Sequence, residues 1–224
     1  DITLYNEALE WKEKGLMTTS CCPSYVAFIE KNFPELVQHI SHSVSPMILT
    51  AQMIKHSDPT AKCIFIGPCA SKKFEFKLPK TGGAIDCVMS FEELQAFLDA
   101  RGIDTVDCED TVLDNGSFYG RIFAKSGGIV QGLQDVAKDL NVEGLRPIVM
   151  SGIDECRANL TKLKFGKATE NFFEGMACEG GCLNGPLCIT HSPRNIVDVD
   201  KYGSEAKEKT IYNSVKLYEM TQDK

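Results

Sequence analysis

The chain has 224 residues, of which 43% are hydrophobic and 25% charged, and its formal net charge is −7. This composition is ordinary for a globular protein, and the acidic balance argues against a nucleic-acid surface, which needs clustered lysines and arginines. No apolar run approaches the roughly 18 residues of a membrane-spanning helix and no signal peptide is visible, so the sequence predicts a cytoplasmic protein without a membrane span.

Strands alternate with helices along the chain. In order, the pattern predicts a helix over 4–14, a strand over 16–19, helices over 24–32, 34–40 and from Ser45, a strand over 61–66, a strand over 85–89, a helix over 91–99 with a capping box at Ser90, a glycine-bounded turn over 120–128, a helix over 129–140, a strand over 146–150, a helix over 153–165, a strand over 172–176 and a last helix capped by Ser204. This alternation is typical of an α/β fold with mostly parallel sheets flanked by helices.

Three groups of cysteines come directly after predicted strands. Cys22 follows the first strand, Cys69 the second, and Cys178 and Cys182 enclose a pair of glycines after the strand over 172–176. Because ligands of parallel sheets bind at the carboxyl ends of the strands, we expect these cysteines to converge. Four thiolates suit an iron–sulfur cube or a structural zinc, and the irregular spacing favours iron–sulfur.

Other polar and sulfur-bearing residues have plain interpretations when they are considered alone. Glu7 and Glu10 share a helix face that is most simply solvated, and a loop lysine such as Lys72 is most often exposed. The remaining cysteines have no partner at ligand spacing; Cys63 and Cys87 are expected to be small hydrophobes within strands, with Cys108, Cys156 and Cys188 equally without a site role.

Three stretches together carry a family resemblance. Residues 19–23, 68–75 and 174–184 resemble, in order and approximate spacing, the three signature motifs of the iron-only (FeFe) hydrogenase catalytic domain. The resemblance implies two lobes with the cluster site in the cleft between them. It implies that a 4Fe–4S cluster is held by Cys22, Cys69, Cys178 and Cys182, and that Cys182 also bridges to a two-iron unit with carbonyl and cyanide ligands, the H-cluster.

The same resemblance assigns roles to residues around the cluster. Lys72 would donate to cyanide, Met176 would pack against the iron carbonyls, and Cys21 would hand protons to the two-iron unit. The proton path would continue through Glu7, Ser41 and Glu10. Implied partners are a ferredoxin or another iron–sulfur electron carrier and the hydrogenase maturation proteins.

Departures from the family pattern indicate a divergent, sensor-like branch. Tyr25 stands where the prototype enzymes have Trp, and Gly67 where they have Met. The third motif runs into Asn184-Gly185-Pro186 in place of a glycine triplet. The chain also has no Cys-x2-Cys-x2-Cys run, so residues 1–224 are expected to be a partial catalytic domain without ferredoxin-like domains and without the first part of the catalytic domain. The alternative function is a non-catalytic iron–sulfur sensor or a cluster-assembly-type protein on the same scaffold.

Overall fold

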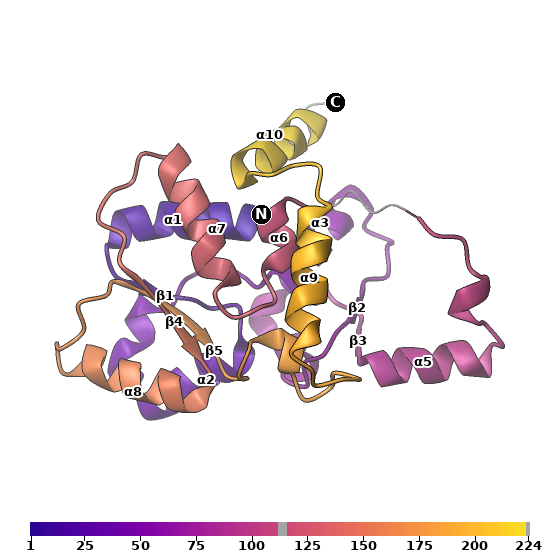
Figure 1. Cartoon of the computed structure of the whole chain (residues 1–224), viewed down its shortest axis with the longest axis horizontal. Coiled ribbons are helices and arrows are strands. Elements are labelled where there is room, and N and C mark those ends of the chain that lie inside the picture. Colours follow the sequence, from indigo (N-terminus) through magenta and orange to yellow (C-terminus); the bar gives the residue numbers. More distant parts are fainter. Residues whose placement is uncertain (112–115, 223–224) are drawn as a thin grey trace.

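Two parallel sheets form the framework of the chain. The computed structural model describes residues 1–111 and 116–222, with side chains as far as residue 216 in the last helix. In these residues three strands pair in the order β1–β5–β4 and two others pair as β2–β3; their bounds are β1 (Met17–Thr18), β2 (Ile64–Ile66), β3 (Cys87–Met89), β4 (Pro147–Ser151) and β5 (Phe172–Met176). The predicted α/β class, with parallel sheets flanked by helices, is confirmed (Figure 1).

Helices connect and cover the strands. Their bounds are α1 (Ile2–Lys14), α2 (Pro23–Asn32), α3 (Pro46–Ser57), α4 (Lys72–Glu75), α5 (Phe91–Ala100), α6 (Phe118–Ile122), α7 (Gly128–Asp139), α8 (Ile153–Lys164), α9 (Arg194–Ser204) and α10 (Ile211–Gln222), with 3-10 turns η1 (Pro34–His39), η2 (Pro79–Thr81), η3 (Thr105–Asp107) and η4 (Cys182–Asn184). The capping box at the start of α5 is present as predicted, because Ser90 Oγ accepts from the Glu93 amide at 3.1 Å and Glu93 Oε2 accepts from the Ser90 amide at 2.7 Å.

The central strand β5 is buried on both faces. Side chains alternate along a strand, so Phe172 and Met176 pack into a core formed with α1 and α7, whereas Phe173 packs into a second core formed with α2 and α8. Figure 1 shows the three-stranded sheet between these two pairs of helices. The arrangement directs the carboxyl end of β5, and the third motif after it, to one edge of the sheet.

Gly175 fixes how α2 packs on this sheet. A Cβ built at Gly175 would lie 2.2–2.4 Å from three ring atoms of Tyr25, so the ring rests directly on the β5 backbone. Tyr25 is fully buried, and its hydroxyl is 2.6 Å from Thr18 Oγ1, which itself donates to the Phe173 carbonyl at 2.9 Å. The tyrosine that departs from the family pattern therefore locks the helix that follows Cys22 onto the strand that precedes Cys178.

The second sheet has a smaller core of its own. Met47, Ile48 and Ala51 of α3 pack there with Cys63 and Val88. Beyond this sheet, α5 extends away from the body of the molecule and none of its residues is buried (Figure 1). No helix in the described ranges is long and apolar enough to cross a membrane.

Several local predictions are wrong. Gly120 lies inside α6, so the predicted turn is confined to the residues before Gly127, which has a left-handed φ of 86°. Ser204 ends α9 instead of capping the last helix, which starts at Ile211. The serine resembles a cap locally, but Gly203 packs closely against α6 and keeps the helix regular through this point. Cys87 is exposed, not a buried hydrophobe, because its side chain lies on the open face of a two-stranded sheet.

Candidate functional site

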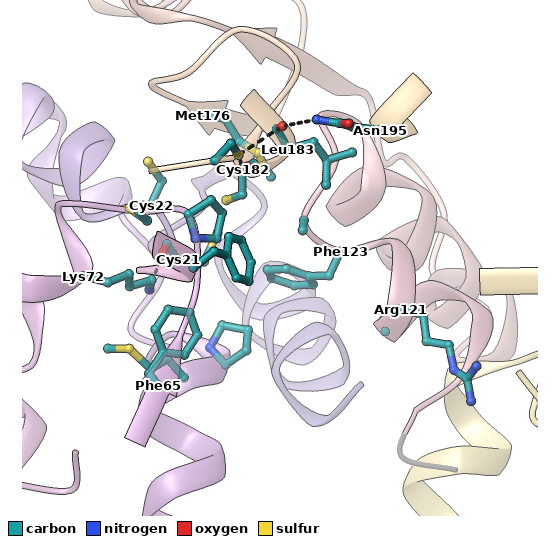
Figure 2. Close-up of a pocket in the computed structure, with 18 of the residues that line it drawn as sticks. Cys21, Cys22, Phe65, Lys72, Arg121, Phe123, Met176, Cys182, Leu183 and Asn195 are labelled. Atoms are coloured by element: carbon teal, nitrogen blue, oxygen red, sulfur yellow. Dashed lines mark hydrogen bonds between the residues drawn. The ribbon is translucent and has the colours of Figure 1, made fainter. Parts of the chain in front are cut away.

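A cavity of about 570 Å³ lies where the carboxyl ends of the two sheets meet. Segments after β1, β2 and β5 and residues of α6 contribute its walls; among them are Cys21, Cys22, Phe65, Cys69, Lys72, Phe123, Met176, Cys182 and Cys188. Figure 2 shows Cys22, Cys182 and Met176 close together at one end of the cavity, and Phe65 and Phe123 on other sides of it, whereas Arg121 points away from its centre. Cys22, Cys69 and Cys182, which follow three separate strands, line this one cavity, whereas Cys178 lies outside its lining.

The four predicted ligand cysteines influence one another electrostatically. The pKa of Cys182 is raised to about 12, mainly by burial and also by the neighbouring Cys22 and Cys69. Cys178 is outside the cavity lining, yet after burial the charges of Cys22 and Cys69 contribute to its raised pKa. Thiols crowded in this way stay neutral at neutral pH unless a cation is present, and a bound metal group deprotonates them.

These residues fit an iron–sulfur cluster better than a single ion. Within the described residues, no three His, Cys, Asp or Glu side chains converge as one metal ion requires. The thiols instead surround a cavity with largely apolar walls, such as Phe65 and Phe123. Soft thiolates around a large space with mostly apolar walls are the donor set of a multi-iron cluster. Their roles as ligands remain predictions.

Lys72 is buried at the edge of the cavity, contrary to the plain expectation of a solvated loop lysine. Its Nζ donates to the Cys21 carbonyl at 3.1 Å and to Glu75 Oε2 at 2.6 Å. An ammonium has three N–H groups, and these contacts use two of them. The short α4 therefore holds the cation in place, with one N–H group available for an anion in the cavity.

Paired glycines bring the third motif against the cavity. Gly181 has a left-handed φ of 82°, and a Cβ there would lie 2.6 Å from the Ser126 amide nitrogen and 2.8 Å from Met176 Sδ. The close approach lets the Cys182 amide donate to the Ala124 carbonyl at 2.8 Å. Met176 is buried at the end of β5, and its thioether lies in the cavity wall beside Cys182 (Figure 2).

Glu7, Ser41 and Glu10 form a polar track away from the cavity. Glu7 is fully buried, so the solvated-face interpretation is wrong for it, and neither carboxyl oxygen has a hydrogen-bond partner with good geometry. Its pKa is raised to about 8, mainly by burial and also by the charges of Glu10 and Glu174. Glu7 in turn raises the pKa of Cys21, after the larger effect of burial. Ser41 Oγ donates to Glu10 Oε2 at 2.8 Å.

Glu174 anchors β5 and was not singled out from the sequence. Its buried carboxylate accepts from the Gly127 amide at 2.6 Å and from the Val130 amide at 2.7 Å, at the amino end of α7. Burial raises its pKa to about 7, although these backbone bonds oppose the rise. One signal was available, because a carboxylate inside an otherwise apolar strand needs a specific partner.

Cys188 lies in the cavity wall, which the sequence did not predict. Its thiol donates to the Leu183 carbonyl at 3.2 Å. Asn195 supports the same loop by donating to that carbonyl at 3.1 Å (Figure 2). The spacing after Cys182 matches no ligand pattern, so only the folded loop reveals that this thiol faces the cavity.

Comparison with known proteins agrees with this geometry. A family model described as "Iron only hydrogenase large subunit, C-terminal domain" matches residues 1–186. The chain is 28% identical over 262 residues to Iron hydrogenase 1 of Clostridium pasteurianum, covering 95% of this chain and 45% of that protein. It is 34% identical over 93 residues to the cytosolic Fe-S cluster assembly factor NAR1 of Kluyveromyces lactis, covering 42% of this chain and 20% of that one.

A solved structure shows the same fold. The FeFe-hydrogenase HydA1 of Chlamydomonas reinhardtii, in a variant form, superposes with a TM-score of 0.65 at 20% identity, over 93% of this chain and 71% of that one. The chain spans about half the length of the curated hydrogenases it matches. The family match over residues 1–186 includes all three motifs that line the cavity, and the chain therefore belongs to the family of the iron-only hydrogenase large subunit, C-terminal domain.

Proposed function

We propose that this domain is a hydrogenase catalytic domain that interconverts protons, electrons and dihydrogen. The observation that supports this most directly is the buried Glu7 carboxyl, placed between Cys21 at the cavity and the half-buried Glu10. A buried carboxyl without hydrogen-bond partners costs stability. A protein that only holds a cluster has no use for such a group, whereas proton delivery to a buried site requires one.

Four cysteines would hold the cofactor in this proposal. Cys22, Cys69, Cys178 and Cys182 would bind a 4Fe–4S cluster, and Cys182 would also attach a two-iron unit with carbonyl and cyanide ligands. When bound, this H-cluster supplies the electrons and the iron site at which protons and dihydrogen interconvert. The crowded thiols described above support this assignment, because a cationic iron group stabilises the thiolate forms that burial and crowding otherwise disfavour.

The chain itself would move protons and shape the pocket. With a pKa near 8, Glu7 carries a proton at neutral pH and can pass it towards the Cys21 thiol or receive one from it. Ser41 links this region to Glu10 by its hydroxyl. The third N–H of Lys72 would bind an anionic ligand such as cyanide, and Met176 would exclude water with a soft apolar side chain.

The surrounding system follows from the same proposal. Electrons would come from a ferredoxin or another iron–sulfur carrier, and the two-iron unit would come from hydrogenase maturation proteins. Residues 1–224 would be part of a larger catalytic domain, and the cytoplasmic location remains a prediction.

A cluster-binding protein without hydrogen chemistry is the second candidate. Similarity to a cytosolic Fe-S cluster assembly factor over 93 residues favours it. The departure at Tyr25 does not distinguish the candidates, because its ring has a structural role against Gly175. The assembly-type function requires the cysteines but neither the Cys21 thiol nor the Glu7 carboxyl.

Infrared spectroscopy separates the two candidates. The protein is produced anaerobically with hydrogenase maturation factors, and carbonyl and cyanide stretches are expected if the two-iron unit is bound. Cys21→Ala should then keep its iron and lose roughly 100-fold or more of the hydrogen turnover, as expected for loss of a proton-transfer group. Cys63→Ala, which alters a buried thiol in the small core of α3, should keep both. Iron–sulfur absorption without carbonyl and cyanide bands would refute the hydrogenase proposal and favour the second candidate.

A further inference from the structure

His42 lies at the outer end of the polar track that begins at Glu7. Its amide donates to both oxygens of Glu10, at 2.9 and 3.1 Å, and its ring Nδ1 is 3.4 Å from Glu10 Oε1. The ring Nε2 is 3.5 Å from Lys14 Nζ, and Lys14 also pairs with Glu10 at 2.6 Å. Three side chains that can carry protons thus meet where the track reaches the surface.

Exposure distinguishes the members of this group. The Glu10 side chain is 14% exposed and that of Lys14 is 26% exposed, whereas the His42 side chain is 80% exposed. Water therefore reaches the imidazole much more freely than it reaches the carboxylate behind it. Imidazole is also the side chain that binds and releases protons near neutral pH, whereas a lysine ammonium ordinarily holds its proton there.

The contacts also orient the ring. An ammonium can only donate a hydrogen bond, so Nε2 faces Lys14 with its lone pair. The neutral ring then carries its proton on Nδ1, which faces Glu10. Three charged or titratable groups of the described residues surround His42. Two of them, Glu10 and Lys14, belong to α1, and the third, His39 of η1, also has Lys14 as a neighbour.

We propose that His42 is the residue through which the track of Glu7, Ser41 and Glu10 exchanges protons with water. For inward transfer, Nε2 leaves its contact with Lys14 and takes a proton from hydronium or a buffer acid, the N–H bond at Nδ1 breaks, and an O–H bond forms at Glu10 Oε1. The ring is then neutral with its proton on Nε2, and it resets when Nε2 releases a proton to water or a buffer base and Nδ1 takes one up. Outward transfer is the reverse, and no electron is exchanged. His42 acts through Glu10 and is a positioning and proton-exchange residue. The inference rests on the proposed hydrogenase function.

The first test follows hydrogen turnover of the cofactor-loaded full chain in dilute buffer. His42→Gln should lose roughly tenfold or more of the rate, and added imidazole should restore most of it, because free imidazole can protonate Glu10 directly. An equal concentration of sodium chloride should not restore it. His56→Gln changes another exposed histidine, on α3, and should match the wild type.

The second test needs no cofactor. Nuclear magnetic resonance of the chain labelled with nitrogen-15 at histidine reports which ring nitrogen carries the proton, and His42→Gln identifies the His42 signals. The neutral ring should carry its proton on Nδ1 in the wild type, and this preference should weaken in Glu10→Gln, because Nδ1 loses the carboxylate that it faces at 3.4 Å. His56 should not respond to the same change.

The outcomes separate this inference from the function on which it rests. A wild-type loaded chain without hydrogen turnover overturns both, and the failure is then visible in the wild type itself. An active wild type with an equally active His42→Gln in dilute buffer overturns the role of His42 alone. Loss that imidazole cannot restore, or a His42 ring tautomer that Glu10→Gln leaves unchanged, overturns it too. Loss with imidazole rescue, together with the changed tautomer, supports it.

Discussion

Gly175→Ala is the sharpest structural test of how the site is held together. The added Cβ would lie 2.2–2.4 Å from three atoms of the Tyr25 ring, whereas carbon atoms in contact are about 3.5–4.0 Å apart. The ring or the strand would therefore have to shift by more than about 1 Å in a core packed to near crystal density. The Tyr25 hydroxyl is held by Thr18 at 2.6 Å, so the ring cannot move without straining that hydrogen bond.

The steric overlap with the Tyr25 ring and the strain on its hydrogen bond together determine how much stability Gly175→Ala should cost. Overpacking a core costs about 1–3 kcal/mol, and loss of a buried hydrogen bond adds about 0.5–1.5 kcal/mol. We expect the free energy of unfolding to fall by roughly 2–4 kcal/mol. Since Tyr25 lies just after Cys22 and Gly175 just before Cys178, the same shift should also lower the iron content of reconstituted protein.

Urea unfolding of the chain without metal measures the change. The matched control is Gly67→Ala, whose Cβ would also meet an aromatic ring, at 2.7 Å from Phe65. Phe65 is only half-buried and can turn aside, so this control should cost less than about 1 kcal/mol. The packing argument fails if Gly175→Ala costs less than about 0.5 kcal/mol, or no more than the control. Tyr25→Leu combined with Gly175→Ala should recover part of the loss.

Three further changes probe the buried charges, each by urea unfolding. The pKa of Glu7 is raised from 4.5 to about 8 in the folded chain, so between about pH 4.5 and pH 8 the native state holds a proton that the unfolded state has lost, and wild-type stability falls as the pH rises. Glu7→Gln should therefore match the wild type at pH 5 and exceed its free energy of unfolding at pH 8.5 by roughly 3–5 kcal/mol. The same dependence of stability on pH in both proteins would contradict this. Glu174→Gln places a side-chain NH2 group against backbone N–H donors and should lower the free energy of unfolding by about 1–3 kcal/mol. The control Glu143→Gln changes an exposed carboxylate and should have little effect. Equal effects of the two changes would refute the anchoring role of Glu174. Lys72→Met leaves the Glu75 carboxylate buried without its cation and should lower the free energy of unfolding by roughly 3–5 kcal/mol. Adding Glu75→Leu should recover most of this stability. If it does not, loss of the ion pair is not the cause.

Much of the framework is encoded locally. The short, largely apolar run from Phe172 to Met176 and the capping box at Ser90 need only neighbouring residues, and both elements were predicted correctly. The end of α9 at Ser204 was not predicted, because local signals cannot distinguish a serine that caps the start of a helix from one at which a helix ends. Packing of Gly203 against α6, far away in the sequence, decides between the two.

The sequence by itself determined the family, the α/β class and the three motifs from which Cys22, Cys69 and Cys182 reach one cavity, since the carboxyl ends of parallel strands lie on the same side of a sheet. Only the tertiary structure decided which side chains lose water. Glu7 and Glu10 are three residues apart on one helix, yet Glu7 is fully buried and Glu10 retains contact with solvent. Burial depends on what packs from elsewhere in the chain, and it is the main reason that the pKa of Glu7 is raised to about 8. The fold of the loop after Cys182, in turn, places Cys188 in the cavity wall. Spacing along a helix specifies which residues share a face, but the partner of that face is chosen by the fold.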